Sequence, residues 1–176
     1  MDLAQSRALN SIVKVGQLLP DFALPAAVPG KNGAIEDTTI TPADFLGRPL
    51  VLFFYPKDAT SGCTIEVCGF RDLHPEFEKV GAAIVGVSRD SVRSHRRFIE
   101  NQQLPYPLAA DAGGALIKSW GLLLNATMYG KPVTKVARST FVVDGTGVVR
   151  RIYEKVTPFG HAQEVLELVR SIARDG

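Results

Sequence analysis

Two cysteines, Cys63 and Cys68, are the only thiols in this 176-residue chain. An apolar run ends at Tyr55, and Pro56 and Gly62 mark a turn before a helical pattern that begins close to Cys63. A thiol at the start of a helix meets the positive end of the helix dipole and several unpaired backbone N–H groups. Both favour the thiolate, which is the reactive form of cysteine. The position of Cys63 therefore predicts a nucleophilic sulfur.

The spacing of the two cysteines limits how they can react with each other. Residues five apart on an ideal helix diverge by roughly 140° and have Cα atoms about 8 to 9 Å apart. A disulfide tolerates at most about 7 Å between Cα atoms. A Cys63–Cys68 disulfide therefore requires this helical segment to unwind, so Cys63 reacts first and Cys68 reaches it after local unfolding.

The first reaction of such a thiolate is attack on another sulfur or on a peroxide oxygen. Attack on a peroxide gives a sulfenic acid, which a second thiol converts to a disulfide. Displacement at an O–O bond also needs hydrogen-bond donors and a fixed cation. Thr60 offers a hydroxyl, the Cys63 N–H is a second donor, and Arg138 is a candidate cation because it precedes a predicted strand of the same sheet. The residues alone do not exclude three other arginines, namely Arg48, Arg71 and Arg89.

Several side chains near the cysteines have simpler interpretations. Cys63 could be a structural thiol, because free cysteines are often buried, and Cys68 could fill the core of a one-cysteine enzyme. A zinc site from Cys63, Cys68 and His74 is disfavoured because the spacing splays these ligands and a fourth is missing nearby. Glu66 is interpreted as support for the first helical turn. The three histidines, His74, His95 and His161, are interpreted as surface or capping residues.

The hydrophobic pattern predicts an α/β fold with a mixed central β-sheet flanked by helices on both faces. Residues 50–55 and 82–88 are continuous apolar runs typical of buried parallel strands. Asp144-Gly145-Thr146-Gly147 joins two further strands as a hairpin. This order of elements fits the thioredoxin-like class, in which sites lie beyond the carboxyl ends of the strands. Cys63 follows such an end.

The sequence also predicts the other helices, strands and loops of the chain. Pro75 is expected to kink or split the helix that follows Cys63, near His74. Residues 1–15 are expected to form a weak helical or extended leader, and residues 16–176 a single domain. The expected helices are two short ones (42–46 and 115–120, the second capped by Asp111), a longer one (91–103) and a final amphipathic helix (160–174). The expected strands are a short one (106–109) and two more (139–143 and 148–153). The remaining segments are an edge strand or entry loop (16–25), a loop with a short hairpin (26–39) and a less regular insertion (121–137).

Composition and charge narrow the function classes. The formal net charge is +2, from 20 basic and 18 acidic residues, which gives no reason to expect nucleic acid or an acidic membrane as a partner. The N-terminus lacks the apolar core of a signal peptide, and no apolar run approaches the roughly 20 residues of a membrane helix. We therefore expect the reducing cytoplasm, where a cysteine pair serves redox chemistry or metal binding rather than a structural bridge.

The motif around Cys63 resembles a known family. Pro56, Thr60 and Cys63 spell P-x-x-x-T-x-x-C, and the run FYPKDATSGCTIEVCGFRD is similar to the active-site segment of peroxiredoxins. The close Cys63–Cys68 pair resembles the PrxQ or bacterioferritin-comigratory-protein branch, whose members are atypical 2-Cys thiol peroxidases. The resemblance covers residues 15 to 174 through four further segments: GQLLPDFALP, VGVSRDS, MYGK and ARSTFVVDGTGVVRRIY.

This resemblance implies an antioxidant enzyme that reduces hydrogen peroxide and organic hydroperoxides to water and alcohols. Cys63 would be the peroxidatic residue and Cys68 the resolving one. Thr60 and Arg138 would bind the peroxide oxygens and stabilise the thiolate, and Pro56 would shield it. The Cys63–Cys68 disulfide would be reduced by thioredoxin or a similar dithiol protein, without metal, flavin or haem, by a monomer or a weak dimer.

Two features depart from the family pattern, and two other functions stay open. Ser61 stands where the family often has Pro, and Ile65 and Val67 make the surface presented to a reductant more apolar. The same cysteine pair could serve a protein thiol–disulfide oxidoreductase, although that class usually has C-x-x-C. It could also serve a peroxide sensor or holdase that passes its disulfide to a partner.

Overall fold

The apolar run after Pro49 forms β3 (Leu50–Phe54), and all five of its residues are buried. In the computed structural model, which describes residues 12–175, β3 belongs to a seven-stranded sheet of order β2-β1-β5-β4-β3-β8-β9. It pairs in parallel with β4 (Ala83–Ser88) and antiparallel with β8 (Ser139–Val143). The sheet is therefore mixed, as the sequence predicts. Its other strands are β1 (Leu24–Pro29), β2 (Ile35–Ile40), β5 (Leu108–Ala110) and β9 (Val149–Tyr153).

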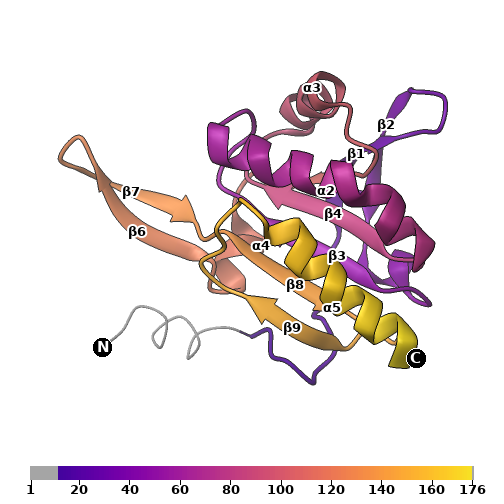
Figure 1. Cartoon of the computed structure of the whole chain (residues 1–176). Helices are drawn as coiled ribbons and strands as arrows, with labels where there is room; N and C mark the ends of the chain where they lie inside the picture. Colours follow the sequence, from indigo (N-terminus) through magenta and orange to yellow (C-terminus); the bar gives the residue numbers. More distant parts are fainter. Residues whose placement is uncertain (1–11, 176) are drawn as a thin grey trace.

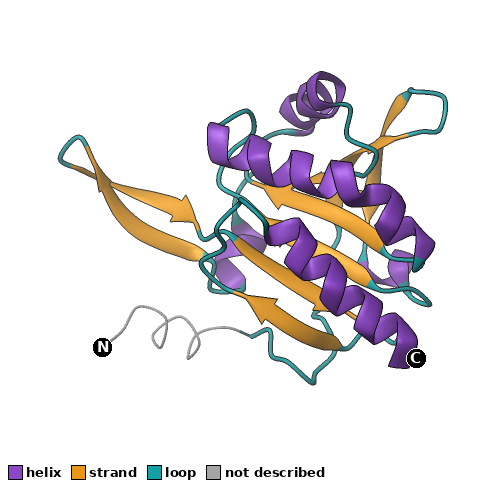
Figure 2. Cartoon of the chain, viewed as in Figure 1, coloured by secondary structure: helices purple, strands orange, loops and turns teal. Residues whose placement is uncertain are grey.

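Helices cover both faces of this sheet (Figure 1, Figure 2). Successive side chains of a strand point to opposite faces, so β3 contributes to two cores. Val51 and Phe53 pack in the core shared with the three longer helices, and Leu52 and Phe54 pack in the core on the other face. The first face carries α2 (Ser61–Lys79), α3 (Val92–Gln102) and α5 (His161–Asp175), and the second carries η1 (Pro42–Phe45) and α4 (Ala115–Ser119).

The helix α2 is continuous through Pro75, so the predicted split near His74 is wrong. A proline inside a helix costs about 3 kcal/mol, because it removes one backbone hydrogen bond and crowds the preceding turn. Phe70 and Phe77 are fully buried on either side of Pro75, and each buried phenylalanine contributes roughly 1.5–3 kcal/mol. Packing against the sheet therefore offsets the cost of the proline and holds α2 as one helix.

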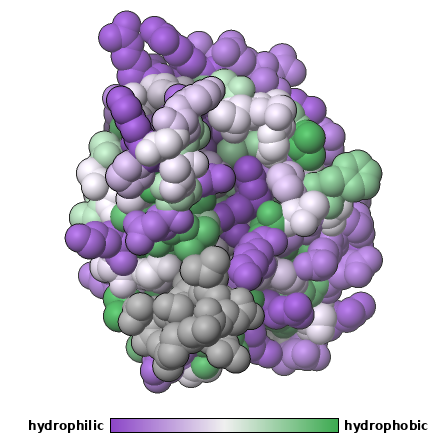
Figure 3. All heavy atoms as spheres, turned by 90° about the vertical axis from the view of Figure 1, so that its left-hand side faces the viewer, coloured by the Kyte–Doolittle hydropathy of each residue, from purple (hydrophilic) through white to green (hydrophobic). Residues whose placement is uncertain are grey.

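Residues 121–137, predicted as a less regular insertion, instead form a regular hairpin of β6 (Leu123–Met128) and β7 (Lys131–Val136). Tyr129 and Gly130 form its turn with φ angles of 53° and 76°, which is the pattern of a two-residue type I′ turn. The hairpin projects away from the layers (Figure 1). On the face from which it projects, hydrophilic and hydrophobic side chains are interspersed (Figure 3).

Several boundaries differ slightly from the prediction. The expected hairpin within residues 26–39 is longer, since β1 and β2 pair from Leu24 to Ile40 at the edge of the sheet. Asp111 accepts a hydrogen bond from the Ile117 N–H in α4, while Gly114 occupies the N-cap. Most of the predicted leader, residues 1–11, lies outside the described residues. Within residues 12–175, no helix is both long and apolar enough to cross a membrane.

Candidate active site

Cys63 is the third residue of α2, and its side chain is fully buried. The N-cap of α2 is Thr60, whose side chain makes no capping hydrogen bond. The first N–H groups of a helix lack partners within the helix, so the amides around Cys63 are available to hold negative charge. The chain enters α2 from the carboxyl end of β3, which is where the sequence predicts a site.

Arg138 meets Cys63 from the neighbouring strand. In the β3–β8 register Phe54 is paired with Ser139, so the residue before Ser139 lies beside the point where the chain leaves β3. The Arg138 Nη2 donates to Cys63 Sγ at 3.2 Å. The backbone of Arg138 is itself fixed, because its carbonyl accepts a hydrogen bond from the Val156 N–H at 3.0 Å. The structure thus places the predicted cation against the predicted nucleophile.

The three other candidate arginines have different partners. Arg71 donates to the Gln102 carbonyl at 2.8 Å, and Arg89 donates to Thr134 in β7. Arg48 lies over the Phe45 ring, with 5.3 Å between the guanidinium carbon and the ring centroid. The first two contacts join segments that are distant in sequence, and the third is local to the end of η1. Among the four candidates, the hydrogen bond to Cys63 belongs to Arg138.

Glu66 is more than the helix support that the sequence indicates. Its Oε1 accepts a hydrogen bond from Arg138 Nη1 at 2.8 Å, and its side chain is fully buried. Its second oxygen, Oε2, has no hydrogen-bond partner within the described part of the chain. Burial raises the pKa of Glu66 to about 7, although the Arg138 charge opposes this shift. Arg138 therefore bridges a buried carboxyl group and the Cys63 sulfur.

Gly62 allows this close approach, a role that the sequence does not reveal. A Cβ atom at Gly62 would lie 3.3 Å from Arg138 Nη2 and 3.6 Å from Pro158 Cγ. The first separation is tighter than most contacts of a Cβ atom and the second is ordinary, so a side chain here would shift the guanidinium by a few tenths of an ångström. The absence of a side chain lets Arg138 lie against the first turn of α2.

Cys68 lies further along the same helix, with its thiol directed toward α3. Its Sγ donates to Gln102 Oε1 at 3.3 Å, and the thiol is half-buried. Burial raises the pKa of Cys68, with a smaller opposing effect of Arg71. Both cysteines are free. Because α2 is helical over both positions, a disulfide between them requires this part of α2 to unwind.

Thr60 and Pro56 belong to the segment that leads to Cys63. Within the described part of the chain, neither forms a hydrogen bond to the Cys63 sulfur. The Thr60 hydroxyl donates to the Lys57 carbonyl at 2.9 Å, which leaves the Thr60 oxygen as an acceptor rather than a donor. Pro56 is half-buried at the start of the loop that joins β3 to α2. Their predicted roles toward a peroxide remain predictions.

Comparison with known proteins agrees with this geometry. The AhpC/TSA family matches residues 15–152. Peroxiredoxin Bcp of Xanthomonas campestris is 41% identical over 153 residues, covering 87% of this chain and 92% of the relative. The chain belongs to the peroxiredoxin family, in its Bcp and PrxQ branch. As a peroxiredoxin it is a peroxidase of the oxidoreductase class.

Further relatives and solved structures extend the comparison. Chloroplastic peroxiredoxin Q of Populus jackii is 37% identical, over 91% of this chain and 70% of the relative. A solved structure of Xanthomonas campestris peroxiredoxin Q superposes with a TM-score of 0.78 at 38% identity, covering 93% of this chain and 99% of that chain. The structure of a cysteine-to-serine variant of Xylella fastidiosa PrxQ superposes with a TM-score of 0.80 at 34% identity, covering 92% of this chain and 98% of that chain. The thioredoxin-like fold is thereby confirmed.

Two of the three histidines of this peroxiredoxin are buried, so their interpretation as surface or capping residues is wrong. His95 is completely buried, with its Nδ1 2.8 Å from Asp58 Oδ2. His161 is 6% exposed and forms a hydrogen bond to Thr140 through Nε2 at 2.8 Å. Burial, together with the nearby Arg138 charge, lowers the pKa of His161 to about 4. The partners, Asp58 and Thr140, are distant in sequence from these histidines, so the local sequence does not indicate that the histidines are buried.

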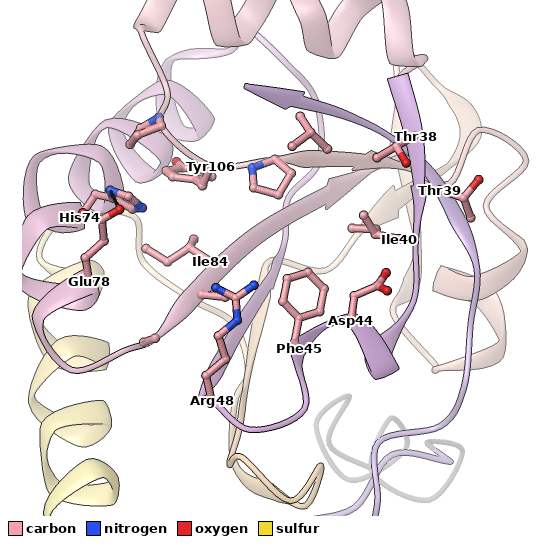
Figure 4. A pocket seen from close by; sticks show the side chains of 15 residues that line it. Thr38, Thr39, Ile40, Asp44, Phe45, Arg48, His74, Glu78, Ile84 and Tyr106 are labelled. Carbon is pink, nitrogen blue, oxygen red and sulfur yellow. Dashed lines mark ion pairs between the residues drawn. The ribbon is translucent and has the colours of Figure 1, made fainter. Parts of the chain in front are cut away.

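Two other kinds of site receive no support. Among residues 12–175 the structure brings together no cluster of three or more His, Cys, Asp or Glu side chains that could hold a metal ion. A hollow of about 470 Å³ lies beside the second half of α2, lined among others by Phe45, Arg48, His74 and Tyr106 (Figure 4). From His74 to Cys63 is roughly 16 Å along the helix, so this hollow is separate from the thiol.

Proposed function

We propose that this peroxiredoxin reduces hydrogen peroxide and organic hydroperoxides with Cys63 as the peroxidatic residue. The observation that carries the proposal is the guanidinium of Arg138, 3.2 Å from a sulfur in the first turn of α2. A fixed positive charge and a helix N-terminus both favour the thiolate. A related protein, the Xanthomonas campestris bacterioferritin comigratory protein, is described as having alkyl peroxide reduction activity.

In the proposed first step the Cys63 thiolate attacks the terminal oxygen of a hydroperoxide. A sulfur–oxygen bond forms, the O–O bond breaks with its electron pair, and the leaving oxygen takes a proton to become an alcohol or water. The product on the enzyme is Cys63 sulfenic acid. Arg138 and the free N–H groups of α2 stabilise the charge that moves onto the leaving oxygen. The Thr60 oxygen, whose hydrogen is directed to Lys57, would accept a hydrogen bond from the peroxide O–H.

In the second step the Cys68 sulfur attacks the sulfenic sulfur. The S–O bond breaks, water leaves, and the Cys63–Cys68 disulfide remains. The intact helix keeps the two Cα atoms about 8 to 9 Å apart, beyond the reach of a disulfide, so the first turns of α2 unwind in this step. The Gln102 contact holds the Cys68 thiol away from Cys63 until then. A dithiol protein such as thioredoxin would return both cysteines to thiols.

The proposed cycle also bears on assembly and location. Both cysteines belong to one chain, so the cycle closes in a monomer, which is the state we propose. Each turnover ends in a disulfide that must be reduced, and this favours a reducing compartment such as the cytoplasm.

The direct test is hydroperoxide consumption coupled to thioredoxin and its reductase. Wild-type protein is expected to consume peroxide, and Cys63→Ser to have no activity above background. The matched variant Cys68→Ser keeps the first turnover and loses the later ones. If Cys63→Ser consumes peroxide as fast as wild type, the proposal is wrong.

Two further assays address the alternative functions of the cysteine pair. Efficient reduction of insulin disulfides with negligible peroxide turnover would identify a protein thiol–disulfide oxidoreductase instead. One dominant mixed-disulfide partner other than thioredoxin, trapped with Cys68→Ser, would identify a peroxide sensor.

A further inference from the structure

Asp58 is the one buried residue of the loop 56–60, which joins β3 to α2. Its carboxylate accepts three hydrogen bonds: from the Tyr55 hydroxyl at 2.6 Å, from the Ser94 hydroxyl at 2.8 Å and from His95 Nδ1 at 2.8 Å. Its backbone N–H donates to Asp90 Oδ2 at 2.8 Å. The proposed chemistry at Cys63 uses none of these groups, yet they hold the loop that leads to it.

The partners of Asp58 are fixed from the other side. His95 is completely buried, and its Nε2 lies 3.0 Å from the Ala109 carbonyl in β5. Both ring nitrogens of His95 are thus held, Nδ1 by the Asp58 carboxylate and Nε2 by the Ala109 carbonyl. Burial and the Asp58 charge raise the pKa of Tyr55 well above its ordinary value, so its hydroxyl keeps its hydrogen and donates. Asp58 is therefore tied to Tyr55, the residue that follows β3, and to Ser94 and His95 in α3, and His95 in turn contacts β5.

The residue after Asp58 has a backbone conformation that needs such support. Ala59 has φ of 65°, in the left-handed region that L-residues other than glycine rarely adopt and that strains the chain. An alanine side chain cannot make the local hydrogen bond that helps Asn or Asp there. The next residue, Thr60, is the N-cap of α2, and Cys63 follows three residues later. The turn at Ala59 thus sets the direction in which α2 begins.

We propose that Asp58, together with Tyr55 and His95, forms a positioning cluster that imposes the left-handed turn at Ala59 and thereby holds Cys63 against Arg138. The proposal rests on the proposed function, because its consequence is the rate at which Cys63 reacts with peroxide. These three residues do not touch the reacting atoms; they act through the loop. Small displacements of a reacting group lower rates steeply, by up to about a hundredfold for 1 Å.

The test compares variants in a Cys68→Ser background, in which no Cys63–Cys68 disulfide forms and the first oxidation of Cys63 is followed separately. Asp58→Ala removes all three acceptor contacts and is expected to lower the second-order rate constant for Cys63 oxidation roughly tenfold or more. Asp58→Asn retains the shape of the side chain, and its amide oxygen can still accept from the Tyr55 hydroxyl, so its rate is expected to stay within about threefold of the parent. Adding Ala59→Gly to Asp58→Ala recovers roughly fivefold, because glycine adopts the left-handed turn without support.

The control is Val149→Ala, which weakens the core on the opposite face of the sheet and is expected to leave the rate within about twofold. Should Asp58→Ala fail to fold, Tyr55→Phe removes one of the three contacts and is expected to slow oxidation roughly threefold. The proposal is overturned if Asp58→Ala reacts at the parent rate, or if Val149→Ala slows the reaction equally. An inert Cys68→Ser parent would instead refute the proposed function. In that case amide hydrogen exchange of residues 57–63 still tests whether the cluster holds the loop: exchange should be faster in Asp58→Ala and unchanged in Val149→Ala.

Discussion

The buried Glu66 carboxyl group makes the stability of this peroxiredoxin depend on pH in an unusual direction. One pKa unit corresponds to about 1.4 kcal/mol, so the rise from 4.5 to about 7 amounts to about 3 kcal/mol. The group is fully buried, so solvent does not reduce this figure. The folded pKa lies above the unfolded one. The stabilisation of the folded protein by the protonated Glu66 carboxyl group is therefore fully present below pH 4.5 and is lost as pH rises through about 7.

Glu66→Gln removes this titration while keeping an acceptor for Arg138. We expect the free energy of unfolding of the variant, relative to wild type, to increase by about 3 kcal/mol between pH 4.5 and pH 7. Urea unfolding of the reduced proteins with linear extrapolation at several pH values measures this difference. Glu164→Gln, at an exposed position of α5, controls for the removal of one carboxylate. A difference between Glu66→Gln and wild type that stays constant with pH, or that falls, would refute the reasoning.

Three other variants test neighbouring parts of the site. The pKa of His161 is lowered from 6.5 to about 4 in the folded protein, so the stability that neutral His161 contributes is present above pH 6.5 and is lost as pH falls. In urea unfolding, the free energy of unfolding of His161→Asn should therefore increase by about 3 kcal/mol relative to wild type between pH 6.5 and pH 4. Gly62→Ala should raise the unfolding free energy by up to about 1 kcal/mol, because alanine favours a helix. Its Cβ would displace Arg138, so single-turnover peroxide kinetics should be slower; faster kinetics would contradict the role of Gly62. Arg138→Lys keeps the charge but has one ammonium nitrogen, whereas Arg138 places separate nitrogens against Glu66 and Cys63. Stopped-flow measurements should therefore show a roughly hundredfold loss of peroxide reactivity, and a loss below threefold would contradict the role of the guanidinium.

The residues whose signals are local could be predicted from the sequence. Cys63 stands between an apolar strand and a helical pattern, and both elements are present where expected. Arg138 could be proposed because it precedes a strand, yet only the pairing of Phe54 with Ser139 separates it from the other arginines. The two-stranded insertion was missed because its strands are largely exposed on both faces and lack apolar alternation.

The contacts that join distant segments gave no signal in the sequence. Asp58 and His95 are 37 residues apart and meet only because the loop 56–60 and the start of α3 both lie at the carboxyl end of the central strands. Pro75 predicts a kink or a split in α2, but α2 is continuous because the local cost of a proline is smaller than the gain from burying Phe70 and Phe77. The sequence indicates only that Glu66 supports the first helical turn, whereas its side chain is buried and paired with Arg138. In each case tertiary packing outweighs a local preference.

The central claim is that the sulfur in the first turn of α2 is oxidised by peroxide and is then joined by Cys68. The most direct measurement is time-resolved mass spectrometry of the reduced protein after one equivalent of hydrogen peroxide. We expect one oxygen atom to appear first on Cys63, followed by its loss as the Cys63–Cys68 disulfide forms. A first oxidation on Cys68, or two thiols that remain unmodified, would contradict the account.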